Sequence, residues 1–362
     1  MSPKKPSIGE CIYCGSKGKM SDEHGWPHLF GEFEGFPHLR KHVCAACNNR
    51  KLGPLEDQFS HSGEIALFRR LLDIEGRDGH VAIDPFVRGS VGAAPLRLLV
   101  VDPKSRLQLL ATVDPGFDGN SIHIHWLNQL VAVDPAGKEI QIPFGDDIQT
   151  LDGLVTLLAK AGVSPPARVW WLAFGTLKKI IRDVVQTWTG GYEWQELEEP
   201  GRVIQPGGEF VSSVPKDRFY ICRAIAKIGL NYLLASSNGS ITGLEPYLHD
   251  VKDYVSNGGE DKDFVTVTQG QIVQMPADTG PASWCHVAAA DYRGGLLWVS
   301  LQFFYGPGYQ PPRYDVKLAR TYDVTPEFSR HGHQFVYGNS EKGTAGYVGR
   351  ADPLFLSRYQ RS

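Results

Sequence analysis

The sequence predicts an α+β protein, in which a small N-terminal domain held together by a metal precedes a larger mixed α+β domain with an antiparallel sheet. Four of the six cysteines lie in the first 47 residues, as two CxxC pairs. The rest of the 362 residues alternates strand-like apolar runs with helical segments. With 42% hydrophobic and 21% charged residues, the composition is that of a globular protein and excludes disorder, collagen and coiled coil.

The chain is long enough for two domains, which we place at 1–61 and 62–362, with a sub-boundary near 145–165. No stretch approaches the roughly 20 apolar residues that a membrane-spanning helix needs. No apolar run follows Lys4 and Lys5, so the sequence shows no secretory signal. We therefore expect a cytoplasmic protein with no membrane partner.

The four N-terminal cysteines predict a structural zinc site. Each CxxC unit, Cys11 with Cys14 and Cys44 with Cys47, places two thiolates on one tight turn, and two such turns complete a tetrahedral site. A disulfide framework is the alternative, but a cytosolic chain of this length neither needs nor readily keeps one. Because four thiolates leave no open position, a hydrolase that uses this zinc is excluded. The solitary cysteines, 222 and 285, are expected in the core.

The segment between the cysteine pairs carries the polar residues that the metal leaves free for chemistry. It contains Glu23-His24-Gly25-Trp26-Pro27-His28-Leu29-Phe30-Gly31, and the second pair runs into Asn48-Asn49-Arg50-Lys51. Residues 1–53 hold eight Lys/Arg and five Asp/Glu, a net charge of +3. Because the whole chain has a net charge of −3, the remaining residues carry −6. A polyanion contact is therefore expected to be local to the N-terminal region.

This segment resembles the HNH endonucleases, in particular the four-cysteine, zinc-stapled branch of the ββα-metal nucleases. The resemblance covers about residues 8–60. It consists of the first cysteine pair, the Glu23-His24 hairpin motif ending at Gly31, and the C-x2-C-N-x2-K pattern from Cys44 to Lys51. Two features depart from the family pattern: Asn48 stands where His is frequent, and the middle Asn has no clean counterpart. Only His38 and His42 precede Cys44, so the group that orients His24 stays open.

The resemblance implies a metal-dependent cleavage of phosphodiester bonds. His24 is expected to act as general base, since imidazole can activate water near neutral pH. Glu23 and Asn48 would hold the catalytic Mg2+ or Mn2+, a hard cation that takes oxygen ligands and keeps several waters. Zinc would then be structural and the second metal catalytic. A surface-turn His24 beside an ordinary loop carboxylate is the alternative interpretation.

Nucleic acid is the expected partner, and the resemblance favours DNA over RNA. Arg50, Lys51 and His28 are candidates for phosphate contacts, each with a plain solvated position as the alternative. Trp26 and Phe30 are expected to pack under the hairpin. A bacterial defence or restriction-type nuclease fits this layout, in which the 62–362 domain serves recognition, regulation or homo-oligomerisation. The rival hypothesis is a non-catalytic zinc-ribbon module that binds nucleic acid or protein.

Beyond residue 61 the sequence predicts secondary structure but discloses no further motif. Strands are expected at 96–101, 107–113, 121–127, 264–268, 272–275, 284–290, 296–304 and 315–318, with a hairpin turn at 290–295. Helices are expected at about 176–188 and 218–235. On the second helix Arg223, Lys227 and Asn231 recur every fourth residue, a stripe that predicts a solvated face, with a phosphate-binding ridge as the alternative. From residue 321 onward an ordered tail or terminal extension is expected.

Overall fold

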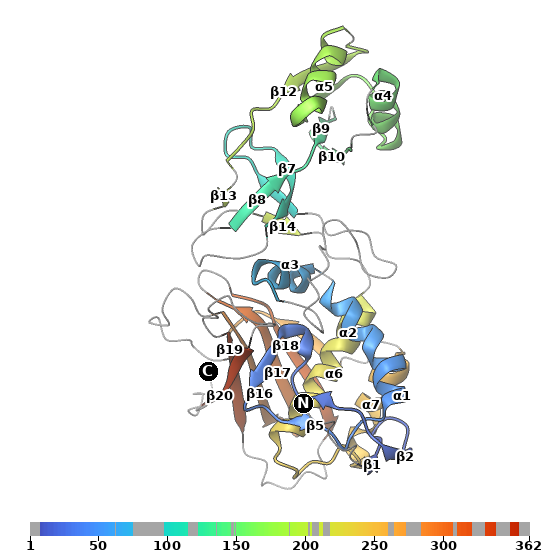
Figure 1. The fold of residues 1–362 in the computed structure, drawn as a ribbon, viewed down its shortest axis with the longest axis vertical. Coiled ribbons are helices and arrows are strands. Elements are labelled where there is room, and N and C mark those ends of the chain that lie inside the picture. The colour runs from blue at the N-terminus through green and yellow to red at the C-terminus, as the bar shows by residue number, and fades with distance from the viewer. Residues whose placement is uncertain are drawn as a thin grey trace. The chain divides into compact units, whose positions relative to one another are not determined.

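The computed structural model of the chain is a mixed α+β structure with several sheets (Figure 1). It describes residues 8–61, 63–74, 98–114, 122–134, 136–145, 148, 150–187, 189–201, 203–204, 210–212, 218–259, 264–272, 284–306, 310–320, 330–337 and 348–354. No helix within these ranges has both the length and the apolar character that crossing a membrane requires.

The chain divides into two compact units. The first comprises Met1–Pro85, Gly89–Ala94 and Pro215–Ser362, and the second comprises Phe86–Arg88 and Pro95–Val214. This division differs from the predicted one, because the 61–62 boundary lies inside the first unit and 145–165 lies inside the second. The N-terminal segment shares a core with the C-terminal third of the chain, and a linear reading of the sequence does not reveal that association.

The N-terminal segment is built from short strands followed by helices. Strands β1 (Ile8–Glu10) and β2 (Lys17–Lys19) pair antiparallel, as do β3 (Glu23–His24) and β5 (His38–Leu39). Between β3 and β5 lie the short helix η1 (His28–Phe30) and strand β4 (Glu32–Glu34). The helical part runs through α1 (Ala45–Cys47), the π-type turn η2 (Asn48–Leu52), α2 (Gly53–Ser60) and α3 (Gly63–Leu71).

A seven-stranded sheet forms the centre of the first unit. Its order is β15 (Val265–Thr268), β18 (Arg313–Arg320), β17 (Leu296–Tyr305), β16 (Cys285–Arg293), β19 (His331–Tyr337), β20 (Val348–Leu354) and β4. All neighbours are antiparallel except β20 and β4, which are parallel. The turn predicted at 290–295 is confirmed, and Gly294 and Gly295 take positive φ there. The segment from 321, predicted as an ordered tail or terminal extension, is ordered at 331–337 and 348–354, but these residues are strands within the central sheet and no extension of it.

Helix α6 (Arg218–Ser236) packs against this sheet, and α7 (His249–Asn257), preceded by η4 (Pro246–Leu248), packs against α6 (Figure 1). Gly229 of α6 allows close approach, since a Cβ there would lie 3.1 Å from Val316 of β18. The predicted helix at 218–235 is thus confirmed. It contacts both the sheet and the N-terminal segment, so it is buried on more than one side.

Aromatic side chains from the N-terminal segment complete the core of the sheet. The ring of Trp26 stacks on Phe335 of β19 with centroids 4.0 Å apart, and the ring of Phe30 stacks on Phe303 of β17 at 4.9 Å. Trp26 and Phe30 are buried, as the sequence predicted for packing residues. Burial of aromatic surface of this size is the main force that holds the N-terminal segment on the sheet.

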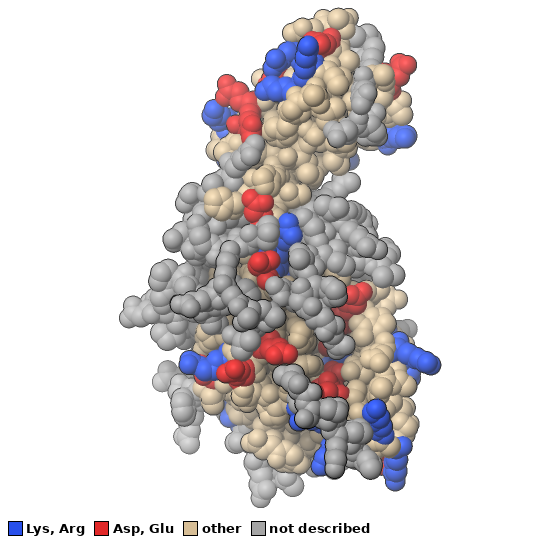
Figure 2. Space-filling view, viewed as in Figure 1, with Lys and Arg blue, Asp and Glu red and all other residues tan. Residues whose placement is uncertain are grey.

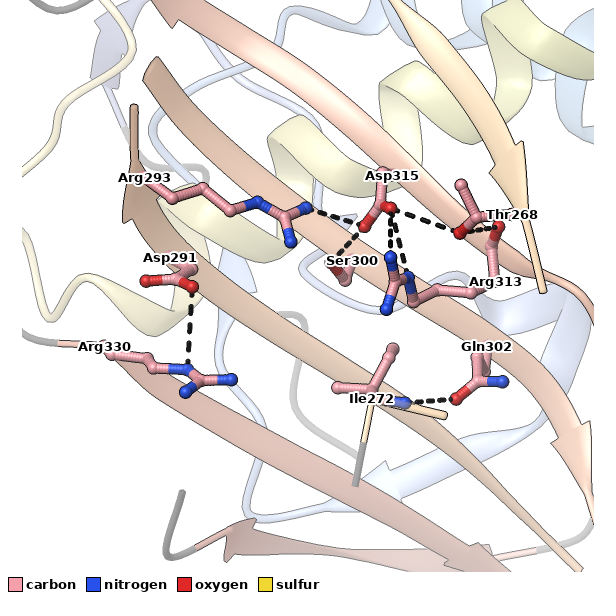
Figure 3. A network of polar contacts seen from close by, with 9 residues as sticks. All are labelled: Thr268, Ile272, Asp291, Arg293, Ser300, Gln302, Arg313, Asp315 and Arg330. Atoms are coloured by element: carbon pink, nitrogen blue, oxygen red, sulfur yellow. Dashed lines mark hydrogen bonds and ion pairs between the residues drawn. The ribbon is translucent and has the colours of Figure 1, made fainter. Parts of the chain in front are cut away.

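A polar network spans β16, β17 and β18 of the same sheet (Figure 3). The buried Asp315 carboxylate accepts hydrogen bonds from Arg293 (2.9 Å), from Arg313 (2.8 Å) and from the Ser300 hydroxyl. Burial opposes ionisation, but the Ser300 hydrogen bond and the two guanidinium groups lower the pKa of Asp315. The carboxylate is therefore charged and fully paired, which specifies the register of three strands.

The second unit contains two sheets. One has the order β13 (Val203–Ile204), β8 (Ile122–Trp126), β7 (Gln108–Val113), β6 (Leu98–Val101), β14 (Phe210–Ser212). The other has the order β10 (Glu139–Pro143), β9 (Gln129–Val133), β11 (Ala167–Leu172), β12 (Tyr192–Glu196) and packs with α4 (Leu151–Lys160) and α5 (Gly175–Thr187). The predicted helix at 176–188 corresponds to α5, whose Leu177 and Ile181 enter the core.

Candidate functional site

The four N-terminal cysteines converge as the sequence predicted. Their Sγ atoms all lie within 4.8 Å of one another, and Cys14 Sγ lies 3.7 Å from Cys44 Sγ. A tetrahedral site with Zn–S bonds near 2.3 Å has sulfur–sulfur edges of about 3.8 Å, so this spacing fits zinc. Cys11, Cys44 and Cys47 are buried and Cys14 is exposed. The cluster is positioned as for a structural Zn2+ ion, with no place for a substrate ligand.

Two local turns present the thiols. In the first, the Gly15 amide donates to the Cys11 carbonyl (2.8 Å), and Gly15 has the positive φ of 68° that this tight turn requires. In the second, Cys44 caps helix α1, where its sulfur accepts from the Cys47 amide at 3.4 Å. Hydrogen bonds from Ser16 lower the pKa of Cys14 to about 6, so this thiol is a thiolate at neutral pH and ready to bind metal.

His24 lies at the end of β3, directly opposite His38 of β5 in the antiparallel register. The two imidazole rings have centroids 4.4 Å apart, and the ring of His28 lies 5.3 Å from His24. Burial lowers the pKa of His24 to about 4, with a further contribution from the positive charges that His38 and His28 can carry. His24 is therefore neutral at pH 7 and able to accept a proton.

Asp22 orders the neighbouring imidazole. Its Oδ1 atom lies 2.9 Å from Nδ1 of His38 and accepts a hydrogen bond from Arg40 Nε at 3.1 Å. Burial opposes ionisation, but these two partners lower the pKa of Asp22. The carboxylate thus favours the tautomer of His38 that carries its proton on Nδ1, and Nε2 is then the ring nitrogen that does not face Asp22. The family pattern has a middle Asn, and this sequence has no clean counterpart of it. In the structure, His38 is the polar residue of the hairpin that lies opposite His24.

Glu23 points to the opposite side of β3 and is buried, with 4% of its surface exposed. Its Oε1 atom lies 2.8 Å from Lys227 Nζ and accepts a hydrogen bond from Asn231 Nδ2, also at 2.8 Å. Lys227 in turn donates to Glu56 of α2 at 2.6 Å. The carboxylate predicted to hold a catalytic cation is thus already bonded to two side chains of helix α6.

Lys227 and Asn231 were not identified as candidate site residues from the sequence. The stripe that contains them predicted a solvated face, and this prediction is wrong for both, because each is fully buried. Burial alone would lower the pKa of Lys227, but the charges of Glu56 and Glu23 outweigh it and raise the pKa. The signal that could have found them is a lysine and an asparagine spaced four apart in an otherwise apolar helix.

Asn48 begins the π-type turn η2, immediately after the last zinc ligand, and is buried with 8% exposed. The backbone N–H of Asn48 donates to the Cys44 carbonyl at 2.9 Å, so the zinc turn fixes the position of Asn48. Apart from the cysteines, no three His, Cys, Asp or Glu side chains of the described ranges converge as metal ligands. A hard cation would therefore depend on Glu23, Asn48 and water molecules.

The predicted phosphate-contacting residues lie at the surface or near it. Arg50 and Lys51 are exposed on η2. His28 is partly buried, and its Nε2 atom lies 3.3 Å from Glu32 Oε1. The structure therefore places His28 beside His24 and presents the two cations of η2 to solvent.

A cavity of about 190 Å3 adjoins His24. It lies within the segment between β3 and β5 and is lined by His24, Gly25, Trp26, residues 31–37 and His38. Gly25 is required here, since a Cβ on it would lie 2.4 Å from Ala235 of α6 and 2.5 Å from the Pro37 carbonyl oxygen. The cavity is large enough for several water molecules and gives them access to the two imidazoles.

Comparisons with protein-family models, with curated proteins and with solved structures gave no match for this chain. The geometry of the site and the residue pattern around the cysteines are therefore the basis for assigning a function.

Proposed function

We propose that the protein is a metal-dependent endonuclease of the zinc-stapled ββα-metal type, with His24 as its general base. The observation that carries this proposal is a neutral imidazole beside a water-accessible cavity, on a hairpin fixed next to a four-cysteine centre. A base must be deprotonated before it can act, and His24 meets this condition at neutral pH, but its pKa of about 4 also makes it a weaker base than an ordinary imidazole.

In this proposal each residue of the site has one task. A ring nitrogen of His24 takes a proton from the attacking water, whose oxygen forms the new bond to phosphorus while the bond from phosphorus to the leaving oxygen breaks; a solvent water supplies the proton to the leaving oxygen. Glu23 and Asn48 would hold Mg2+ or Mn2+, which would neutralise charge on the scissile phosphate and on the leaving oxygen. The hydrogen bond between Asp22 and His38 keeps the His38 ring ordered beside His24. The zinc ion would maintain the fold of the N-terminal segment.

The distribution of charge supports a selective nuclease. On the face shown in Figure 2, basic and acidic side chains of the described residues are interspersed, without a continuous basic area. Exposed cations lie two and three positions after Asn48, at Arg50 and Lys51, where they can contact phosphates on either side of the cleaved bond. We propose DNA as the substrate, cytoplasmic action and a defence or restriction role, in which the rest of the chain selects the target.

The test compares the wild type with His24→Ala on plasmid DNA in the presence of Mg2+ or Mn2+. His249→Ala is the matched control, since His249 is 78% exposed on α7 and far from the hairpin in sequence. We expect cleavage by the wild type and the control, a loss of about 100-fold or more in His24→Ala, and equal zinc content in all three. Equal cleavage by His24→Ala would exclude His24 as the base.

A non-catalytic zinc-binding module is the second candidate, and one observation favours it. The Glu23 carboxylate is engaged by Lys227 and Asn231, as expected of a structural residue. Such a module would bind nucleic acid or protein without cleaving it, and the DNA binding of the zinc-loaded protein would be the same with and without added Mg2+ once ionic strength is matched. A wild type that retards DNA and never cuts it would support this candidate.

A further inference from the structure

Helix α6 contributes two buried polar side chains to the predicted nuclease site. Asn231 Nδ2 donates both to Glu23 Oε1 (2.8 Å) and to the backbone carbonyl of His24 (3.2 Å). One amide group therefore holds the side chain of one predicted site residue and the main chain of the other. Residues 23–24 and residue 231 are separated by more than 200 positions, so this contact exists only in the folded chain.

Both side chains of α6 bind the same oxygen of Glu23. Lys227 Nζ and Asn231 Nδ2 each lie 2.8 Å from Oε1, and Lys227 also contacts Glu56. The hydrogen bond from Asn231 and the ion pair with Lys227 both fall on Oε1. Fixing one oxygen in this way orients the carboxylate, as outer partners do for metal-binding carboxylates, and Oε2 would then be the ligand atom.

The Asn231 amide has one end without a partner. Oδ1 of this fully buried side chain accepts no hydrogen bond from the described residues. A buried amide that served stability alone would satisfy both of its ends, and an orphaned oxygen at this place indicates a water or an ion.

We propose that α6 is part of the nuclease site and that Asn231 is a positioning residue, which sets the Glu23 carboxylate and the His24 main chain for metal binding. This inference rests on the proposed function. The sequence has no Asn between His24 and Cys44 that could order the hairpin. Asn231, which lies on the distant helix α6, takes this task through its hydrogen bonds to Glu23 and His24. Lys227 maintains the charge and the direction of the same carboxylate.

The experiment measures Mn2+ binding to the zinc-loaded full-length protein by electron paramagnetic resonance, together with cleavage. Asn231→Leu preserves size and net charge while removing the amide. Gln302→Leu is the matched control, because Gln302 is a buried amide of the same unit that donates to Gly270 and Pro311 and has no contact with Glu23. Glu23→Gln identifies the ligand. If Asn231→Leu does not fold, Asn231→Ser, which is too short to bridge both acceptors, replaces it.

We expect Asn231→Leu to bind Mn2+ about 10-fold or more weakly than the wild type. We further expect kcat to fall while KM for DNA stays the same. Gln302→Leu should lose stability but keep Mn2+ affinity. Unchanged Mn2+ affinity in Asn231→Leu would overturn this inference and leave the nuclease proposal standing. Equal Mn2+ binding by wild type and Glu23→Gln would remove Glu23 as a ligand, and both proposals about the metal would fall together.

Discussion

Lys227 is fully buried, and a buried lysine needs nearby negative charge to stay in the core. Lys227 is held in the core because two carboxylates, Glu23 and Glu56, lie within 2.8 Å and 2.6 Å of its ammonium group. Removing one member of a buried ion cluster leaves the other charges without compensation, which costs more than the cluster contributes. The three side chains therefore act together in stability.

This predicts a large effect for Lys227→Met, a change that preserves the length of the side chain. The free energy of unfolding should fall by about 3–5 kcal/mol, because the buried Glu23 and the partly buried Glu56 lose their counter-charge. Lys252→Met is the control, since Lys252 is only partly buried and donates to one carbonyl, that of Gly243; it should cost about 1 kcal/mol. Urea unfolding followed by circular dichroism measures both. Equal losses in the two variants would contradict the argument.

At the residue scale, the sequence was informative where chemistry is local and uninformative where it is not. The zinc ligands could be predicted because two residues between cysteines define a turn, whatever surrounds it. The burial of Lys227 and Asn231 could not, because a polar residue at every fourth helical position is normally a solvated stripe. Here the face that carries them is covered by the β3–β5 hairpin, and the opposite face packs on the sheet.

At the scale of elements, the zinc centre and the sheet hold the N-terminal segment at separate points. The zinc turns fix β1, β2 and the start of α1, whereas β4 pairs in parallel with β20 at the sheet edge. Between them, the Tyr337 hydroxyl of β19 donates to the Phe30 carbonyl at 2.8 Å. Short strands of two or three residues are not stable alone, so each depends on these attachments.

Removal of zinc should therefore loosen one part of the first unit more than another. In Cys44→Ser, or after chelation, we expect the amides of residues 8–24 and 44–52 to lose protection from hydrogen exchange. The amides of β16 and β17 should keep theirs, because they belong to the sheet. Hydrogen exchange with mass spectrometry measures this, and Cys222→Ser, which alters a core thiol outside the cluster, is the control. Uniform loss across the unit would indicate that the zinc supports the entire core.

Element prediction succeeded where periodicity was strong and failed at the chain end. Helices α5 and α6 and the β16–β17 hairpin lie at or close to their predicted ranges, since apolar spacing and the Gly294-Gly295 turn define them. Strands β19 and β20 escaped prediction because polar residues, glycine and proline interrupt their apolar pattern. Their place is determined by long-range pairing with β16 and with β4, which local propensity does not encode.

At the scale of the whole molecule, the buried His286 and the partly buried His24 and His333 make the stability of the fold sensitive to acid. Burial lowers the pKa of His333 to about 4, as it does for His24, and lowers the pKa of His286 well below its usual range. His286 is fixed as a neutral tautomer, since its Nδ1 accepts from the Phe304 amide while Nε2 contacts the Tyr337 hydroxyl. A proton on Nδ1 would break the first of these bonds.

The sign of the pH effect follows from these shifts. Above pH 6.5 the histidines are neutral in both the folded and the unfolded chain, so they make no difference. Between pH 6.5 and about 4 the unfolded chain binds protons that the folded chain does not, and stability falls as the pH is lowered. Asp315 acts in a more acidic window, because its lowered pKa contributes stability above pH 3.8 that is lost below it.

We therefore expect the urea midpoint of unfolding to decrease steadily from pH 7 to pH 4.5, with His286→Gln showing a shallower decrease than the wild type. Glutamine can still accept and donate hydrogen bonds at this position but does not titrate. His249→Gln, at an exposed position, should follow the wild-type curve. Zinc content must be measured at each pH, since protonation of the thiolates releases the metal and destabilises the chain by a separate route. If His286→Gln and the wild type lose stability in parallel while zinc stays bound, the buried histidines are not the source of the acid sensitivity.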